Sequence, residues 1–197
     1  MTQRQTPIEH AKWANVAPIL AMNVGFLSPL LLFWSSVWGP LRPYADVGPL
    51  SPTPMPYVIL LALSVGTWWL PSLYLRARGW ERDGRVYRWL GVRAFRALVP
   101  DGDWVNRRRR RRQSDFRVVA NRAQASAFLA RTEASERGHT MFLWAGIVSA
   151  VYAWQIGWHG WALLLAVGNL LVNAYPILLQ RYTRGRICRM MGMADRL

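Results

Sequence analysis

Four long blocks of uncharged, mostly apolar residues constrain the fold of this chain more than any other feature. They are residues 16–38, 56–75, 141–158 and 161–179. A helix rises about 1.5 Å per residue, so about 20 apolar residues cross the hydrocarbon of a bilayer. The first block exceeds the roughly 7–15 apolar residues of a signal peptide. The sequence therefore predicts an all-α integral membrane protein with four transmembrane helices, of which the last two form a tight hairpin around His159 and Gly160.

The distribution of arginine predicts how these helices are oriented. Residues 76–140 carry 17 Arg against 7 acidic residues, and the tail 180–197 is also basic, whereas the Pro-rich residues 39–55 hold one Arg and one Asp. Cytoplasmic loops carry the excess of Lys and Arg. Residues 1–15, 76–140 and 180–197 should therefore be cytoplasmic and residues 39–55 external. Both termini would then lie in the cytoplasm, and we expect the protein in the inner (plasma) membrane of a bacterium.

Two groups of tryptophan support the same arrangement. Trp154, Trp158 and Trp161 surround the predicted hairpin turn, and Trp34 and Trp38 end the first block. Tryptophan favours the headgroup level of a bilayer, where its ring is in apolar surroundings and its N–H contacts water. The two groups should therefore lie on the same side of the membrane.

Arginine accounts for 24 of the 25 basic residues, and six arginines form the run Arg107–Arg112. Basic clusters beside a membrane helix usually contact anionic lipid headgroups. Because Arg also binds phosphate bidentately, a more specific alternative is that these residues bind the phosphates of an acyl donor. No nucleic-acid recognition motif accompanies the run, so we expect no nucleic-acid partner.

Two regions of the basic segment have helical periodicity. In residues 85–99 apolar side chains recur every three or four positions, which predicts a helix lying in the membrane interface and ended by Pro100. Residues 114–137 begin with Ser114, a suitable N-cap, and lead into the third apolar block. We expect a second helix there, continuous with the third span.

Glu136 and His139 come at the end of that second helix, just before the third apolar block. Residues three apart on a helix share a face, so the carboxylate and the imidazole can meet. His139 would then act as a general base, with Glu136 fixing its tautomer. The alternative is a structural pair at the membrane interface. The lone Cys188 excludes intramolecular disulfides and cysteine zinc clusters, and no His pair has metal-ligand spacing.

The fourth apolar block contains polar residues that need partners. Asn169 and Asn173 would lie in hydrocarbon, and Pro176 leaves a backbone carbonyl one turn earlier without its helical donor. This region should therefore face other helices or a substrate cleft. Five polar residues follow at the cytoplasmic interface: Gln180, Arg181, Tyr182, Arg184 and Arg186. Snorkelling arginines beside an aromatic belt would explain them without any ligand.

Residues 173–186, NAYPILLQRYTRGR, resemble the "N…PI..QRYNR.R" signature of the glycosyl-4,4′-diaponeurosporenoate acyltransferases, which complete staphyloxanthin-type carotenoids. Glu136 and His139 match the family's Glu-x-x-His, and residues 96–102 (RALVPDG) resemble a basic segment that ends in Asp-Gly. The resemblance covers about residues 85–187.

The resemblance implies transfer of a fatty acyl group from a thioester to a hydroxyl of a glycosylated carotenoid or a similar lipid acceptor. Catalysis would involve His139 with Glu136, and the acyl thioester would be a co-substrate, with no further cofactor and no metal. Six residues would bind substrate or support the site: Asn173, Gln180, Arg181, Tyr182, Arg184 and Arg186.

A non-enzymatic function is the alternative. Twelve Trp offer flat apolar surface for lipids, pigments or neighbouring helices. The chain would then be an accessory or scaffold subunit of a larger membrane complex, such as a photosynthetic pigment–protein complex. Its partners would be membrane lipids, a carotenoid or other pigment, and the other subunits.

Overall fold

The computed structural model describes residues 7–45, 53–76, 84–99 and 121–192, together with residues 107, 111 and 119. The longer helices are α1 (Pro7–Val37), α2 (Met55–Gly66), α6 (Arg122–Gln155), α7 (His159–Asn169) and α8 (Tyr175–Met190). Shorter elements are the 3₁₀ helices η1 (Arg42–Tyr44), η2 (Thr67–Trp69) and η3 (Ser72–Leu75), the helices α3 (Arg85–Trp89) and α4 (Val92–Leu98), and the π-helix η5 (Leu170–Ala174). In these ranges all regular structure is helical, which confirms the all-α prediction.

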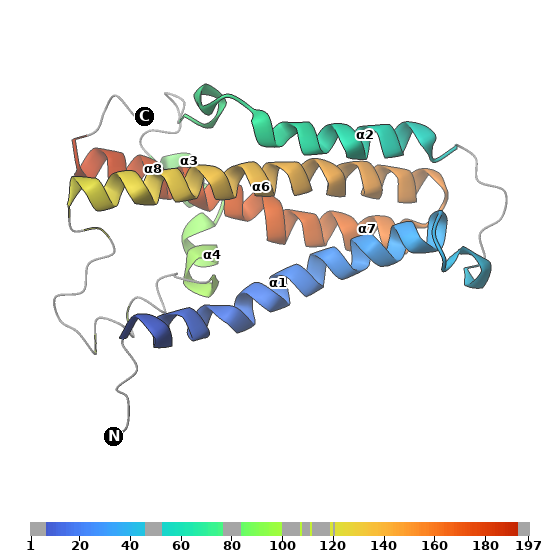
Figure 1. The fold of residues 1–197 in the computed structure, drawn as a ribbon, viewed down its shortest axis with the longest axis horizontal. Coiled ribbons are helices and arrows are strands. Elements are labelled where there is room, and N and C mark those ends of the chain that lie inside the picture. Colours follow the sequence, from blue (N-terminus) through green and yellow to red (C-terminus); the bar gives the residue numbers. More distant parts are fainter. Residues whose placement is uncertain are drawn as a thin grey trace, which may run out of the picture.

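The long helices lie side by side along the long axis of the molecule and form a bundle (Figure 1). Helix α6 lies in the middle and contacts α2, α7 and α8, while α1 crosses α7. The α6–α7 turn, the end of α1 and the start of α2 are at one end of the bundle, and the end of α8 and the start of α6 are at the other (Figure 1). Helices α3 and α4 pack against α8 at that second end. Which of the two ends faces the cytoplasm stays a prediction.

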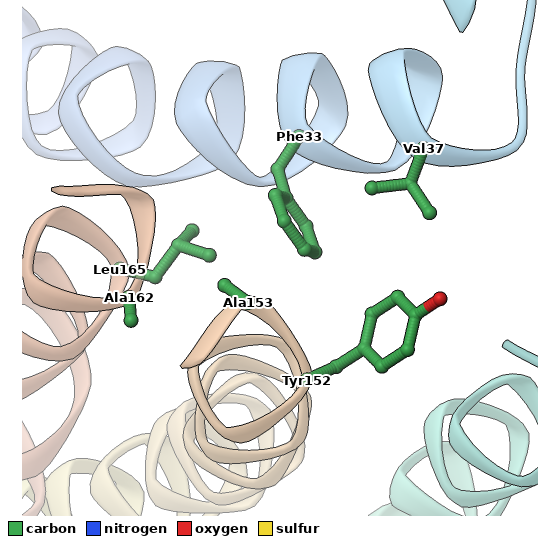
Figure 2. Packing of buried hydrophobic residues seen from close by; sticks show 6 residues of the cluster. All are labelled: Phe33, Val37, Tyr152, Ala153, Ala162 and Leu165. Carbon is green, nitrogen blue, oxygen red and sulfur yellow. The ribbon is translucent and has the colours of Figure 1, made fainter. Parts of the chain in front are cut away.

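An aromatic core joins α1, α6 and α7 near the α6–α7 turn (Figure 2). Phe33 is fully buried there, with its ring centroid 5.9 Å from those of both Trp158 and Trp161. Trp34 stacks on Tyr152 at 5.5 Å. Trp34 of the first block and Trp158 and Trp161 of the hairpin therefore pack around the same core. That they share one side of a membrane stays a prediction.

The hairpin turn comes slightly earlier than expected. Helix α6 ends at Gln155, and His159 and Gly160 already belong to α7. Gly157 has φ +81°, a left-handed conformation that glycine adopts without steric cost. The N–H of Trp158 then donates to the carbonyl of Ala153 at 2.8 Å, which completes a glycine C-cap.

Among the described residues, one helical stretch is long and apolar enough to span a membrane. It is the continuous stretch His159–Met190. Asn23–Val37 and Met55–Trp69 are shorter apolar helices. The second block is not one α-helix, because α2 ends at Gly66 and Pro71 separates η2 from η3. Four transmembrane helices therefore stay a prediction.

The predicted interfacial helix 85–99 is two helices. Gly91 has φ +71° and ends the first of them, so α3 and α4 point in different directions. Tyr87 and Val92 are buried against Tyr182 of α8, whereas Trp89 is 85% exposed. The predicted stop at Pro100 and most of the run Arg107–Arg112 lie outside the described residues.

Helix α6 is continuous from the basic segment into the third apolar block, as expected. It begins at Arg122, where the side chain of Asn121 accepts a hydrogen bond from the N–H of Gln124 at 2.8 Å. The proposed N-cap Ser114 lies outside the described residues. A straight helix of this length carries Glu136 and His139 between the two ends of the bundle.

Candidate functional site

Glu136 is the centre of a buried ion cluster between α6 and α8. Its side chain is 1% exposed. One carboxylate oxygen accepts from Nε of Arg181 at 2.7 Å, and the other accepts from Nη2 of Arg184. Arg181 and Arg184 are three residues apart on α8, so both reach the same face of α6. The negative charge of this buried carboxylate is balanced by its two guanidinium partners. The cluster as a whole has a net charge of +1.

Arginines of α6 and α8 also hold the segment that follows α2. Arg137 donates to two backbone carbonyls of this segment and to Oγ of Ser72, and Arg181 and Arg184 donate to one carbonyl each. The four carbonyls belong to Trp68, Leu70, Tyr74 and Leu75. Arg137 also pairs with Glu133 at 2.9 Å. These bonds fasten η2 and η3 across the cluster around Glu136.

His139 takes part in a chain of side-chain amides. Its Nδ1 lies 3.2 Å from Oδ1 of Asn173, whose Nδ2 donates to Oδ1 of Asn169 at 2.9 Å. Nδ2 of Asn169 donates in turn to the carbonyl of Leu143 at 2.9 Å. A backbone carbonyl can only accept, so the direction of every bond in the chain follows from this last one. Neutral His139 therefore has its proton on Nδ1 and leaves Nε2 as an acceptor.

Local features of α6, α7 and η5 bring this amide chain together. The π-helix η5 begins directly after Asn169 and contains Asn173, and both amides are buried. Pro176 has no N–H to donate to the carbonyl of Val172, four residues earlier. Opposite them, a Cβ on Gly146 would come within 2.4 Å of the amide of Asn169. Only glycine at that position leaves room for the Asn169 side chain.

Burial lowers the pKa of His139 below its ordinary value. Hydrogen bonds with Asn173 and with the backbone of Val172 oppose this shift but do not cancel it. The physical cause is that burial penalises the charged imidazolium. The ring is therefore neutral at physiological pH, which is the state that a general base requires.

The structure does not bring together the pair that the sequence predicted. No hydrogen bond joins Glu136 to His139 among the described residues, because arginines take both carboxylate oxygens and an amide takes the imidazole. The two residues share a helix face, but their partners differ: α8 supplies the arginines that bind Glu136, and η5 supplies the amide that contacts His139. The amide Asn173 therefore has the orienting role that was predicted for Glu136.

The remaining predicted residues lie in different surroundings. Nε2 of Gln180 donates to Oγ of Ser135 at 2.7 Å, while its Oε1 is buried with no partner found. Nη1 of Arg184 is also buried with no partner found. Tyr182 packs against Tyr87 of α3 at 5.9 Å, away from the ion cluster. Arg186 is exposed.

Three contributors are missing from the predicted site residues. Asn169 could have been found from its spacing of four residues from Asn173, which puts both on one helix face. The role of Arg137 could not be predicted from the sequence, because it donates to backbone carbonyls that are far away in the chain. Gly146 resembles any other glycine of an apolar helix. Within the described parts of the chain, no three His, Cys, Asp or Glu side chains form a group that could hold a metal ion.

Comparison with known families identifies the chain. Residues 70–193, more than half of the sequence, match the family model described as glycosyl-4,4'-diaponeurosporenoate acyltransferase. The matched range contains the ion cluster around Glu136 and the amide chain of His139. No curated protein and no solved structure matches the chain. The motifs around His139 and residues 173–186 thus indicated the correct family, and the chain belongs to the glycosyl-4,4'-diaponeurosporenoate acyltransferase family.

Proposed function

We propose that this protein transfers a fatty acyl group from a thioester to a hydroxyl of a membrane-embedded glycosylated carotenoid or a similar lipid. The family match supports a carotenoid acyltransferase-like function in general. The observation that carries the proposal for this chain is the half-buried imidazole of His139, whose Nδ1 is engaged by Asn173. This arrangement leaves one nitrogen of a neutral imidazole to accept a proton.

His139 is the general base of the proposed reaction. Its Nε2 takes the proton from the acceptor hydroxyl while the oxygen attacks the thioester carbonyl. The tetrahedral intermediate collapses, the C–S bond breaks, and the imidazolium returns its proton to the leaving thiolate. Asn173 and Asn169 are positioning residues, because they hold the ring through Nδ1 and carry no charge themselves.

In this proposal Glu136 organises cations rather than the imidazole. Its two bonds to Arg181 and Arg184 fix the guanidinium groups one helical turn from His139. Gln180 and Arg184 each have a buried polar atom that no described residue contacts by a hydrogen bond, and in this proposal such atoms bind substrate. Tyr182 supports α8 through its contact with Tyr87, and the exposed Arg186 faces headgroups or the donor.

The proposed location is the boundary between membrane and cytoplasm. Large apolar side chains are exposed along the bundle, including Leu31 at 67%, Leu63 at 64% and Leu163 at 67%. An exposed apolar surface of this kind suits contact with lipid. With four spans and both termini in the cytoplasm, His139 lies just before the third span. A lipid acceptor could then reach His139 from the bilayer and a soluble thioester from the cytoplasm of a bacterial cell.

Purified protein in lipid nanodiscs, given radiolabelled acyl-CoA and an extracted carotenoid glycoside, tests the proposed reaction. We expect label in a carotenoid product and its release by mild alkali, because an ester is formed. The carotenoid without its sugar is the matched control, since it lacks the accepting hydroxyl. If folded protein forms no ester with any glycoside offered, the enzymatic proposal is wrong, and copurifying subunits or pigment become the question.

A further inference from the structure

A second feature of the cytoplasmic half is a cavity beside the Glu136 ion cluster. It has a volume of about 330 Å³ and lies between η3, α6 and α8. Ser72, Arg76, Glu133 and Arg184 form its polar wall, and the remainder of its lining is apolar. Its volume is within the range of small-molecule sites, which begins at about 300 Å³.

The charges around this cavity do not balance. Arg137 neutralises Glu133, and Glu136 is shared by Arg181 and Arg184. The cavity wall adds Arg76, for which the described residues offer no ion pair. Among the residues that the structure describes around the cavity, four guanidinium groups thus accompany two carboxylates, which is an excess of two positive charges.

Glu133 does not cancel this excess. The hydrogen bond from Ser72 lowers the pKa of Glu133, and Arg137 and Arg184 lower it further against the opposing effect of burial. Glu133 is therefore ionised at neutral pH and already counted among the two carboxylates. Its oxygen Oε1 is engaged by Ser72 and Arg137, both of which also hold the segment that follows α2.

Arg184 has unused hydrogen-bonding capacity at this cavity. Its Nη2 binds Glu136 and the carbonyl of Leu75, while its Nη1 is buried with no partner found. A buried guanidinium N–H without an acceptor is costly, so such a group indicates a missing ligand or water. Arg76 and Arg184 can together supply charge-assisted hydrogen bonds to a phosphate group.

We infer that this cavity binds the phosphate-bearing end of the acyl donor. The inference rests on the proposed acyl transfer and specifies a donor of the nucleotide thioester class, with acyl-CoA as the form to test. Glu133 and His139 are six residues apart on α6, which is about 9 Å along a helix axis. The charged end of the donor would therefore be held one to two turns from the base, and a flexible arm would carry the thioester to it.

Binding of coenzyme A to the detergent-purified full chain tests this inference without any need for catalysis. Arg76→Gln should weaken binding about tenfold, because one charge-assisted bond to phosphate is lost. Arg76 is exposed, so this variant should fold normally. Arg93→Gln removes the same charge from exposed α4, outside the cavity wall, and should change the affinity less than twofold. Equal losses in both variants, or no loss in Arg76→Gln, would overturn the inference.

A second pair of variants tests the cavity by its shape. Ala130 lines the cavity, and Ala127 lies one turn earlier on α6 outside the lining; both are exposed. Ala130→Phe should fill the cavity and weaken coenzyme A binding at least tenfold, whereas Ala127→Phe should not. Unchanged affinity in Ala130→Phe would place the binding site elsewhere.

Two further outcomes separate the possible sources of phosphate and the two proposals. If phosphatidylglycerol binds in an Arg76-dependent manner and coenzyme A does not bind, the cavity takes a lipid headgroup and the inference is wrong. Arg76-dependent coenzyme A binding by a protein that makes no ester would support the cavity and contradict the acyl transfer. If the protein forms the ester and Arg76→Gln binds coenzyme A as tightly as the wild type, the acyl transfer is supported and the cavity is not the coenzyme A site.

Discussion

His139 is oriented by amides rather than by a carboxylate, and this difference affects the pKa of its imidazole. Asn173 fixes the tautomer through a neutral acceptor, so it stabilises imidazolium less than a carboxylate would. A carboxylate in its place would raise the pKa of the ring by about 1–3 units. The half-buried imidazole, whose pKa is lowered by burial, stays unprotonated over a wider range of pH.

The pH dependence of ester formation should reveal this arrangement. In the wild type the acidic limb should fall below the ordinary imidazole value of about 6.5, because protonation removes the base only at lower pH. Asn173→Asp places an anion 3.2 Å from Nδ1 and should move that limb upward by at least one unit. A limb that stays in place, whatever the loss of rate, would show that Asn173 does not act through His139.

Glu136 should matter for folding more than for proton transfer. Glu136→Gln removes the charge from a buried cluster and leaves two guanidinium groups facing a neutral amide, which we expect to cost about 3 kcal/mol of unfolding free energy. Glu133→Gln, three residues earlier on the same helix, breaks a more exposed pair and should cost under about 1 kcal/mol. Reversible unfolding in mixed micelles measures both. Similar small losses would contradict the structural role of Glu136.

At the scale of elements, the close approach of α6 and α7 makes room for the amide chain. Gly146 faces the side chain of Asn169, and the buried Asn169 bonds back to the carbonyl of Leu143. Two helices therefore have to be held near each other for His139 to be oriented on α6. The tight turn at Gly157 and the aromatic core around Phe33 hold them at the far end of the bundle.

Gly146→Ala should disturb both stability and activity. Its new Cβ would meet the Asn169 amide at 2.4–2.7 Å, and because this clash forces the helices or the amide to move, we expect a loss of about 1–3 kcal/mol. Ester formation should fall together with it. Gly160→Ala, in the first turn of α7 with nothing within 4 Å, should leave both unchanged or be slightly stabilising. Equal behaviour of the two variants would contradict the packing described for Asn169.

The sequence predicts elements better than it predicts their breaks and partners. The third apolar block and the periodic segment that precedes it correctly indicated one continuous helix, α6, because no proline or turn signal separates them. Helices end at Gly91 and Gly157, where φ is positive. Because glycine adopts positive and negative φ about equally well, the sequence does not show which glycine ends a helix. Glu136 was paired with His139 by local spacing, whereas α8 supplied stronger partners from 45 and 48 residues away.

At the scale of the whole molecule, the basic and apolar parts divide between the two ends of the bundle. The ion cluster, the cavity and the start of α6 lie toward one end, and the aromatic core lies toward the other. The positive-inside rule predicts that the end with the ion cluster faces the cytoplasm. Both substrates of the proposed reaction could meet His139 from opposite directions.

Cysteine labelling tests this orientation. In a Cys188→Ala background, His159→Cys at the start of α7 should react with a membrane-impermeant maleimide on intact cells, because the predicted topology puts the hairpin outside. Arg186→Cys in exposed α8 should react only in inside-out vesicles. The opposite pattern would reverse the topology and remove the site from the cytoplasmic side.

The central claim is that His139 is the base for acyl transfer, and one comparison tests it most directly. Ester formation by His139→Gln should fall at least about 100-fold, because a positioned general base contributes roughly 10²–10⁴-fold. His159→Gln changes the exposed histidine at the far end of the bundle and should retain the wild-type rate. Both variants should bind coenzyme A as the wild type does. A His139→Gln protein that forms the ester at the wild-type rate would contradict the account.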